Sequence, residues 1–429
     1  MSRFQYHLWF WGVLFSIPTL TFTNQALAQE APSAGEKFTL PQLVEIAIKN
    51  TPILGSQDAR ISEQRMSAAQ SRIWPGVSFD FTIGEKREAD ESGPRYELGL
   101  TQPLPLFGTL GLRSGLFDVE SESWRVRRVA SQITVTLNVV QSAYEYALNR
   151  QKADFAEKRQ KRFGLVHAYL AGREFPTPQR KAERRIVQNR LTGLVSDAIQ
   201  SQAGFAASFQ RLKIYVPFTA GVTPDIEAPW FSGKRSIDEK ELLAKALENN
   251  PDLQIQRLTI KTAELEKSLA SKEGLPEPSF LASYEKSRTD VTEKNYGLGL
   301  GLSLSAWNRN RFGIKSAEQK KIAEERLLWF EEQKLTAELA KTLVEYEAAR
   351  RIILQYPQNL LSDLEKQIQE AEQGFRKGQV DLLTFLEMDD SISETFNRVL
   401  DAQLDFAAKA AELLAATGEQ DLLVQLQSF

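Results

Sequence analysis

The sequence predicts a mainly α-helical protein with a small β part, in which one structural unit occurs twice. Three observations predict this fold class. Matching segments recur about 200 residues apart, which indicates a duplication. Short segments in each copy alternate apolar and polar residues as β-strands do. Long segments are rich in Ala, Leu, Glu, Gln, Lys and Arg, which favour helices. Each unit is therefore predicted as a short helix, a β-hairpin and two very long helices.

The duplication is visible as three matches that follow one another in the same order in both copies. The opening segments have identical spacing, so that Leu43, Ala47, Asn50 and Pro52 correspond to Leu242, Ala246, Asn249 and Pro251. Further on, Tyr96–Leu100 corresponds to Tyr296–Leu300, and Tyr144-Glu145 corresponds to Tyr346-Glu347. We therefore divide the chain into a first repeat at residues 29–230 and a second repeat at residues 231–429.

Residues 1–28 are predicted to be a secretory signal peptide. Arg3 precedes an apolar stretch from Leu8 to Leu20, and the small-x-small triplet Ala26-Leu27-Ala28 follows it. The alternative is an N-terminal membrane anchor, but the stretch is shorter than the roughly 20 residues that a spanning helix needs. If the exported chain enters a membrane, we expect a β-barrel, since only helices and closed barrels satisfy their backbone hydrogen bonds there.

The composition argues against several classes of protein. The chain has no cysteine, which excludes disulfides and thiolate metal sites, and its histidines are His7 and His167. A net charge of -3 with mixed signs argues against a nucleic-acid partner. The sequence shows no glycine-rich phosphate loop and no evident pair of catalytic carboxylates. We therefore expect no enzyme activity, no cofactor and no resident metal.

A β-hairpin is predicted in each copy, at about residues 77–104 and 279–304. Apolar and polar residues alternate along the strands, as in Val77–Gly84 and Tyr296–Ser305. This alternation fits a soluble sheet with one buried face as well as it fits a membrane barrel. The connecting segments Lys86–Pro94 and Lys286–Lys294 are charged and polar, so we predict that they are loops in water.

The length of the strands and their aromatic residues favour the membrane interpretation. Each strand is close to the 9–11 residues that a tilted membrane strand needs. Tyrosines lie near strand ends, where aromatic residues line membrane interfaces. Four strands are too few to close a barrel, so oligomerisation is predicted, and three copies would supply about twelve strands. The residues predicted to face lipid are Phe79, Phe81, Leu298 and Leu300.

Two very long helices are predicted in each copy, within residues 118–215 and 315–417. They run from about Glu120 to Ala171 and Gln179 to Tyr215, and from about Lys315 to Gly374 and Val380 to Thr417. Their apolar residues step by three and four, which is typical of a coiled-coil seam. The seam residues are Ile133, Leu137, Val140, Tyr144 and Ala147, then Leu335, Leu339, Thr342, Tyr346, Ala349 and Ile353, then Ile392, Phe396, Val399, Gln403, Phe406, Ala410 and Leu413. A structural coiled coil without a conduit would show the same periodicity.

The long helices are predicted to reverse direction at two tips. Gly172–Pro178 marks the first tip and Gly374–Val380 marks the second. Within the second tip, Gly378 is well placed to end a helix in the left-handed conformation. In the first tip, Pro176 and Pro178 are predicted to end one helix and start the next.

This arrangement resembles the TolC-like outer-membrane efflux protein family, from Phe38 to about Gly418. The motifs that carry the resemblance are the two Leu-x6-Asn-x-Pro openings, the entries Trp74-Pro75 and Leu275-Pro276 to the hairpins, the exit Leu98–Leu104, and Gly378–Leu383 at the second tip. Their order and their duplication make the resemblance specific.

The resemblance implies an outer-membrane channel of a Gram-negative bacterium. Three chains would form one β-barrel in the outer membrane, with four strands per chain, and a long α-helical barrel in the periplasm. The channel would be a passive exit duct for cargo that an inner-membrane transporter delivers through a periplasmic adaptor protein. The implied partners are therefore a homotrimer, the adaptor, the transporter and outer-membrane lipid.

The resemblance also implies roles for residues at the tips. The family carries acidic gate residues one helical turn apart, just after the tip glycine. In this chain these positions are Thr384, where a hydroxyl replaces the first acid, and Glu387, with Asp381 nearby. The residues implied to dock the adaptor are Gly172, Arg173, Phe375, Gly378 and Gln379.

Two alternatives stay open at this stage. A periplasmic coiled-coil adaptor or scaffold without a pore would also contain long helices, but it would carry one helical hairpin in a β-rich domain. For Thr384 and Glu387, the residues themselves favour a solvated helix face, and only the resemblance places them at a gate. The sequence does not name the cargo, because a channel conducts what its pump delivers.

Overall fold

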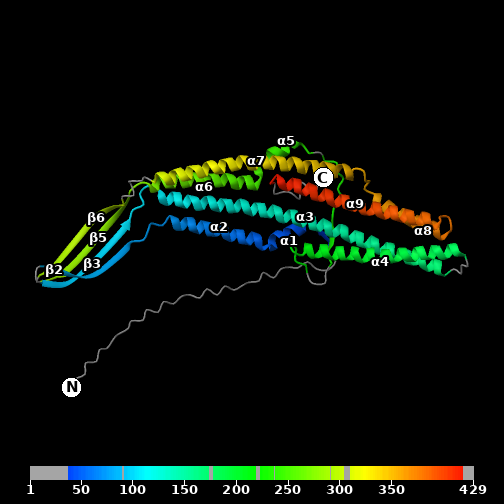
Figure 1. Ribbon diagram of the computed structural model, residues 1–429, viewed down its shortest axis with the longest axis horizontal. Coiled ribbons are helices and arrows are strands. Elements are labelled where there is room, and N and C mark those ends of the chain that lie inside the picture. Colours follow the sequence, from blue (N-terminus) through cyan, green and yellow to red (C-terminus); the bar gives the residue numbers. More distant parts are fainter. Residues whose placement is uncertain are drawn as a thin grey trace, which may run out of the picture.

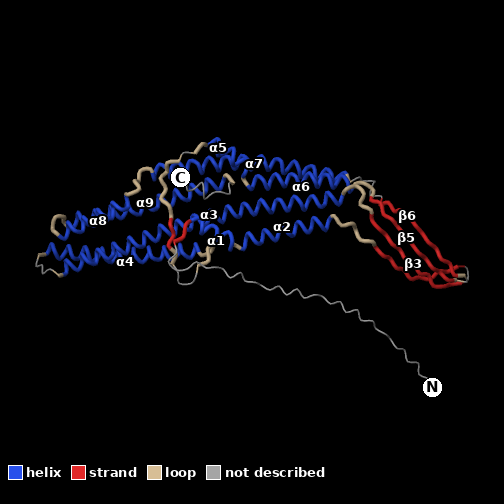
Figure 2. Tube along the Cα trace, turned by 180° about the vertical axis from the view of Figure 1, so that it is seen from behind, coloured by secondary structure: helices blue, strands red, loops and turns tan. Residues whose placement is uncertain are grey.

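The computed structural model describes residues 37–88, 91–172, 177–218, 223–235, 237–289, 291–303 and 310–418. The molecule is elongated, with a β-sheet at one end and helices along the rest of its length (Figure 1). The view from behind shows the same division between sheet and helices (Figure 2). The predicted signal peptide lies outside the described residues.

The same order of elements occurs twice along the chain, as the duplication predicts. The first copy contains β1 (Lys37–Thr39), α1 (Leu40–Asn50), α2 (Pro52–Ser71), β2 (Ser78–Glu88), β3 (Glu91–Pro103), α3 (Thr109–Ala171) and α4 (Pro178–Leu212). β4 (Asp225–Glu227) follows, just before the boundary that we placed between residues 230 and 231. The second copy contains α5 (Glu239–Asn249), α6 (Pro251–Glu273), β5 (Glu277–Arg288), β6 (Thr292–Ser303), α7 (Arg311–Ile353), α8 (Leu360–Arg376) and α9 (Leu382–Ala416). The parallel pair β1–β4, which we did not predict, joins the start of the first copy to the segment just before that boundary.

Each copy opens with two helices, where the sequence predicted one short helix. The Asn-x-Pro motif is the joint between them, since α1 ends at Asn50 and Pro52 is the first residue of α2. Proline suits this position because its missing N–H would have no partner in the first turn. The 20-residue α2 escaped prediction because its apolar stripe is thin: its buried residues are Leu54, Ile61 and Ala68.

The prediction of one continuous helix from Lys315 to Gly374 is wrong, because the structure has two helices there. Helix α7 ends at Ile353 and α8 begins at Leu360, with Pro357 between them. Proline lacks the amide donor and clashes with the preceding turn, so a helix does not continue through it undisturbed.

The larger sheet is antiparallel with the strand order β2-β3-β5-β6. Its strands continue into the segments that we predicted as loops, which corrects that prediction. Lys86 pairs with Gly93, and Lys286 pairs with Lys294. Charged side chains at the end of a hairpin reach water from a paired strand as well as from a loop, so charge alone did not locate the turn.

The predicted seams are confirmed as core except at Leu137 and Thr342, which are half-buried. Tyr144, Tyr346 and Phe406 are almost completely buried in one cluster. The duplicated tyrosines have matching roles, since the Tyr144 hydroxyl donates to the carbonyl oxygen of Pro229 at 3.0 Å and that of Tyr346 to Arg235 at 3.0 Å. Burial raises the pKa of Tyr346 to about 12, which keeps the hydroxyl a donor.

Candidate functional site: the sheet faces and the helical tips

The register of the sheet collects the apolar residues of all four strands on one face. Phe81 lies opposite Leu98, and Phe280 lies opposite Leu300. Residues directly opposite one another in an antiparallel pair share a face. The four residues predicted to face lipid all lie on this apolar face, with exposed fractions of 64% for Phe79, 55% for Phe81, 80% for Leu298 and 76% for Leu300. An exposed apolar surface of this kind marks an interaction site.

The other face of the sheet is polar. It carries Glu97 directly opposite Glu285, a pair of like charges that would destabilise the sheet if nothing lay between them. Arg95 contacts both carboxylates, Glu97 at 3.1 Å and Glu285 at 2.7 Å. On the same face, Lys86 reaches Glu293 at 2.5 Å. These ion pairs order the charges on the polar face.

The second tip has the conformation that the sequence predicted. Gly378 has a φ of 75°, in the left-handed region that favours glycine. The N–H of Gly378 donates to the carbonyl oxygen of Phe375 at 3.0 Å, and that of Gln379 donates to Gly374 at 2.9 Å. Gly378 and Gln379 are exposed at the surface of the turn.

The three predicted gate residues lie together at the start of α9. The Asp381 carboxylate caps the helix, accepting hydrogen bonds from the N–H and the hydroxyl of Thr384, both at 2.9 Å. These hydrogen bonds hold the pKa of Asp381 below its ordinary value. Glu387 follows one turn later, is exposed, and has no ion pair within the part of the chain that the structure describes. Asp381 and Thr384 are thus engaged with each other, while Glu387 presents a free carboxylate.

Aromatic side chains join the two tips, which the sequence did not predict. Phe375 stacks on Phe385 with ring centroids 5.3 Å apart, and Tyr169 from α3 contacts the edge of Phe375. The Tyr169 hydroxyl donates to the carbonyl oxygen of Arg376 at 3.2 Å. The docking prediction for Phe375 therefore needs correction: its side chain is 9% exposed and supports the tip from inside.

At the first tip, Gly172 is exposed and caps the end of α3 with ordinary right-handed geometry. Arg173, the other docking residue predicted there, lies outside the described residues. Pro178 is the first residue of α4, as predicted.

An ion cluster with a buried centre lies between α3, α4 and α9, and the sequence did not predict it. Arg159 contacts both Asp389 and Asp390, and Arg190 also contacts Asp390. Desolvation lowers the pKa of the adjacent Arg162, against the opposing charge of Asp389. The spacing of the seam could have revealed this cluster. Three residues before Ile392 the seam reaches Asp389, and four residues earlier it reaches Phe385, so an acid occupies a seam position.

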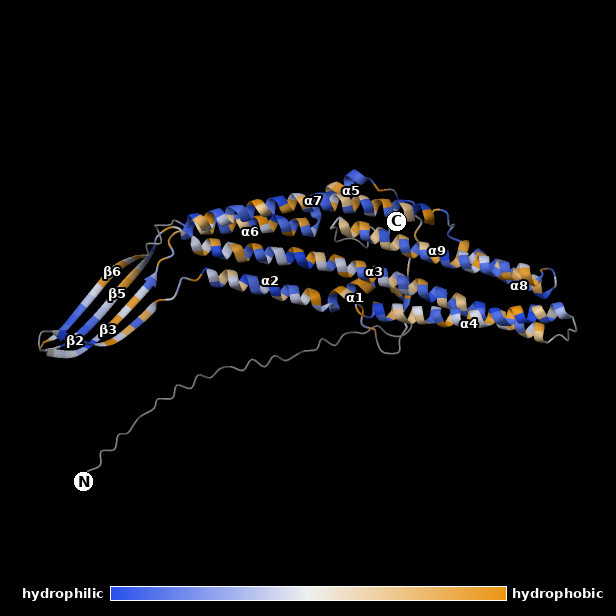
Figure 3. Cartoon of the chain, viewed as in Figure 1, coloured by the Kyte–Doolittle hydropathy of each residue, from blue (hydrophilic) through white to orange (hydrophobic). Residues whose placement is uncertain are grey.

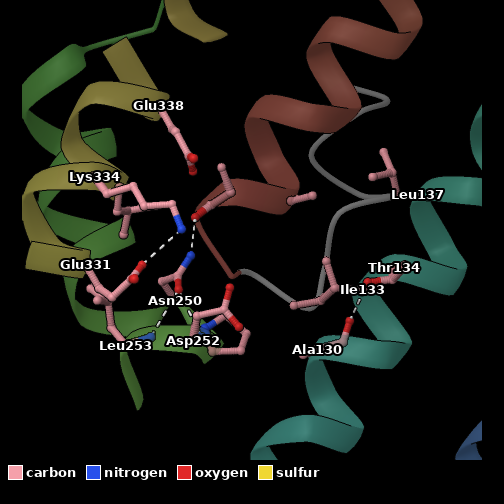
Figure 4. Close-up of a pocket in the computed structure, with 14 residues that line it drawn as sticks. Ala130, Ile133, Thr134, Leu137, Asn250, Asp252, Leu253, Glu331, Lys334 and Glu338 are labelled. Atoms are coloured by element: carbon pink, nitrogen blue, oxygen red, sulfur yellow. Dashed lines mark hydrogen bonds and ion pairs between the residues drawn. The ribbon is translucent and has the colours of Figure 1, made fainter. Parts of the chain in front are cut away.

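A cavity of about 330 Å³ lies between α3, α6, α7 and the end of α9 (Figure 4). Asn250 caps α6 there, accepting from the N–H groups of Asp252 at 3.0 Å and Leu253 at 3.3 Å, and donates to Ala416 at 3.2 Å. Lys334 pairs with Glu331 at 3.1 Å, which raises the pKa of Lys334. These polar groups hold helices together, and we assign them no chemistry.

The described residues contain no group of His, Cys, Asp or Glu side chains arranged to hold a metal ion. Among the helices of the described ranges, none is both long and apolar enough to cross a membrane, and hydrophilic positions interrupt each of them (Figure 3).

Comparison with known proteins gives matches along most of the chain. The family profile described as "Outer membrane efflux protein" matches residues 242–419. The nickel-cobalt-cadmium resistance protein NccC of Alcaligenes xylosoxydans xylosoxydans is 23% identical over 319 residues, which are 72% of this chain and 70% of that protein.

Two solved channels have the same fold. The CmeC outer membrane channel of Campylobacter jejuni aligns with a TM-score of 0.68 at 13% identity, over 91% of this chain and 88% of that one. The open state of the MtrE outer membrane channel of Neisseria gonorrhoeae aligns with a TM-score of 0.66 at 16% identity, over 89% of each chain.

Proposed function

The chain belongs to the outer membrane efflux protein family, and from this premise we propose that three copies of it form the exit duct of a tripartite efflux system. It is an outer-membrane channel with a large periplasmic helical part. The duct has no chemistry of its own in this proposal. Cargo enters from an inner-membrane transporter, by way of a periplasmic adaptor protein, and leaves through the sheet end.

The observation that carries the proposal is the four-stranded sheet with one apolar and one polar face. In the described sheet, β2 and β6 each have a neighbour on one side only. An unpaired strand edge is a ready template for pairing with another chain. We propose that β2 of one copy pairs with β6 of the next, which would close twelve strands around the polar face, as about twelve strands suffice for a barrel with an aqueous interior.

The far end of the molecule suits contact with a periplasmic adaptor. Gly172, Gly378 and Gln379 are exposed at the two tips, and the aromatic contacts of Phe375 and Tyr169 fix the tips relative to one another. A rigid, exposed pair of turns can present a defined surface to a partner. We propose that the adaptor docks there.

For the cargo, we propose divalent transition-metal cations as the first class to test. The name of the relative NccC assigns resistance to nickel, cobalt and cadmium to that protein. On the polar face of this chain, the acids Asp80, Glu97, Glu285 and Glu293 outnumber their basic neighbours Arg95 and Lys86, and this excess of negative charge would favour cations in a lumen. Since no metal-holding group occurs among the described residues, the cations would pass without a resident site.

A combination of fractionation and growth assays tests the proposal. The full chain, expressed in a Gram-negative host that lacks its own efflux channel, should fractionate with the outer membrane and run as a trimer in mild detergent. With the neighbouring adaptor and pump genes it should restore growth on nickel, cobalt or cadmium. A soluble periplasmic monomer would contradict the channel. A membrane trimer that restores growth only on organic toxins would contradict the metal cargo alone.

A further inference from the structure

Three basic residues of β5 and β6 lie on the apolar face of the sheet, at the end that is distant from the helices. Lys286 on β5 lies directly opposite Lys294 on β6 and, on its other side, opposite Tyr96 on β3. Arg288 lies two residues beyond Lys286 on the same strand and therefore on the same face. Figure 1 shows this end of β5 and β6 at the extremity of the molecule.

The positions of Lys286 and Lys294 are unfavourable by themselves. Like charges directly opposite one another destabilise an antiparallel pair. Both lysines and Arg288 are exposed, and none of the three has an ion pair within the part of the chain that the structure describes. An anion from outside the chain would relieve this repulsion.

The acidic residues of the same strand ends do not provide that anion. Glu285 and Glu293 alternate with Lys286 and Lys294, so they lie on the polar face. There they pair with Arg95 at 2.7 Å and Lys86 at 2.5 Å. On β5 and β6 the strand ends thus separate charge between the faces, with paired acids on the polar side and unpaired bases on the apolar side. On β2, Glu85 also lies on the apolar face, where it pairs with Arg87 at 3.1 Å.

The residues next to the lysines complete the profile of a membrane interface. Tyr284 and Tyr296 lie directly opposite each other, one step along the same face, with ring centroids 5.2 Å apart. One further step brings Ala282 and Leu298. Along the strands the face is therefore apolar, then aromatic, then basic. Acyl chains, the interface and an anionic headgroup would meet these three levels in turn.

We propose that Lys286, Arg288 and Lys294 form a binding site for the phosphate-bearing headgroup of an anionic lipid in the outer leaflet of the membrane. The inference rests on the proposed function, since it places the apolar face in lipid. Lysine ammonium groups and the guanidinium fork donate to phosphate oxygens, and the Tyr96 hydroxyl, beside Lys286, is a further donor.

Lipid retention by the full-length trimer tests the site. The trimer is placed in phosphatidylcholine bilayer discs that contain phosphatidylglycerol as the anionic probe, and retained lipid is counted by native mass spectrometry. We expect preferential retention of phosphatidylglycerol, and about a tenfold loss of that preference in Lys286→Gln/Lys294→Gln. The variant Lys286→Arg/Lys294→Arg should keep it. The matched control Lys181→Gln/Lys261→Gln removes the same charge from exposed helical lysines and should leave the preference unchanged.

Other outcomes overturn the inference. If the trimer enters the discs but retains both lipids equally, or if the control variant loses the preference as well, the basic cluster is not a headgroup site. Inorganic phosphate that displaces the lipid at equal concentration would show a simple anion site instead. If the wild-type chain does not enter lipid at all, the proposed channel function is contradicted. Entry into lipid without any preference for phosphatidylglycerol contradicts only the headgroup site.

Discussion

Arg159 on α3 donates from its Nε atom to the carboxylate of Asp389 on α9 at 2.6 Å, across 230 residues of sequence. The side chains are 9% and 1% exposed, so the pair is buried inside one protomer. Removing one partner of a buried pair is costly because it leaves the other charge unpaired in a medium of low dielectric. The pair therefore fixes the register of α3 against α9 just above the tip.

We expect Arg159→Met to lower the free energy of unfolding by about 3 kcal/mol, because Asp389 loses its partner while it stays buried. The midpoint of thermal unfolding measures this effect. Lys152→Met is the matched control, since Lys152 pairs with Asp401 across the same two helices while Asp401 is 62% exposed. Exposed pairs of this kind contribute about 1 kcal/mol or less.

The double variant Arg159→Met/Asp389→Leu should recover part of the lost stability, because Asp389 no longer lies buried without Arg159, while Arg162 loses the opposing charge of Asp389. Equal destabilisation by Arg159→Met and Lys152→Met would contradict the assignment of a special role to the buried pair.

The sequence predicted the strands and seams because their periodicity is local. The spacing of apolar residues by three and four predicts Tyr144 and Tyr346 as seam residues. The strict alternation of apolar and polar residues predicts Leu298 as a strand residue. Periodicity does not say which residues meet across the fold, so the contact of Arg159 with Asp389 could not be predicted from either helix alone. The packing of Phe375 was missed for the same reason, since its partners Phe385 and Tyr169 lie on other helices.

The cap at Asp381 predicts an acid-sensitive second tip. The pKa of Asp381 is lowered in the folded state, so the stability that its cap contributes is present above the unfolded pKa and is lost as pH falls through the folded value. Hydrogen exchange at the start of α9, corrected for the intrinsic effect of pH, should rise below the ordinary aspartate value of 3.8.

Two substitutions of Asp381 distinguish the loss of this helix cap from other effects of low pH on hydrogen exchange. Asp381→Asn keeps a good capping side chain without a titrating group, so the acid-dependent rise should disappear. Asp381→Ala should show fast exchange at neutral pH as well. A tip that behaves identically in all three proteins would show that this cap does not hold the helix end.

The topology prediction places the hairpin ends outside the cell and the helical tips in the periplasm. Cysteines at Ser92 and Thr292, both exposed near the hairpin ends, should react with an impermeant maleimide on intact cells. A cysteine at Gln379 should react only after the outer membrane is permeabilised. Ser287 is a poor labelling site, since it is 2% exposed. Labelling of the tip alone on intact cells would mean the reverse orientation.

The two faces of β6 should respond differently to the same substitution. Leu298→Arg places a charge on the apolar face and should hinder assembly by about 2–4 kcal/mol if the residue lies at mid-bilayer depth. Gly299→Arg places it on the polar face, where a Cβ atom added at Gly299 meets no atom within 4 Å, so the trimer should still form with altered conductance. The yield of trimer in mild detergent measures both. Equal defects would show that the sheet packs on protein.

Glu387 is expected to line the narrowest part of the periplasmic end of the channel. Three copies of one carboxylate around an axis concentrate negative potential where water is limited and charges are poorly screened. Such a ring favours cations and binds divalent or trivalent ions that block passage. The neighbouring Thr384 contributes a hydroxyl that is already engaged with Asp381, so the block should be weaker than a double ring of acids would give.

In planar bilayers, Glu387→Ala should reduce cation preference and Glu387→Lys should reverse it. Glu394 is the control on the same helix, because it is exposed but already paired with Arg398, so Glu394→Lys should change selectivity little. Glu387 lacks such an ion pair among the described residues, which leaves its charge available to the lumen. If Glu387→Lys leaves selectivity and ion block unchanged while Glu394→Lys alters them, the gate lies on another face of α9.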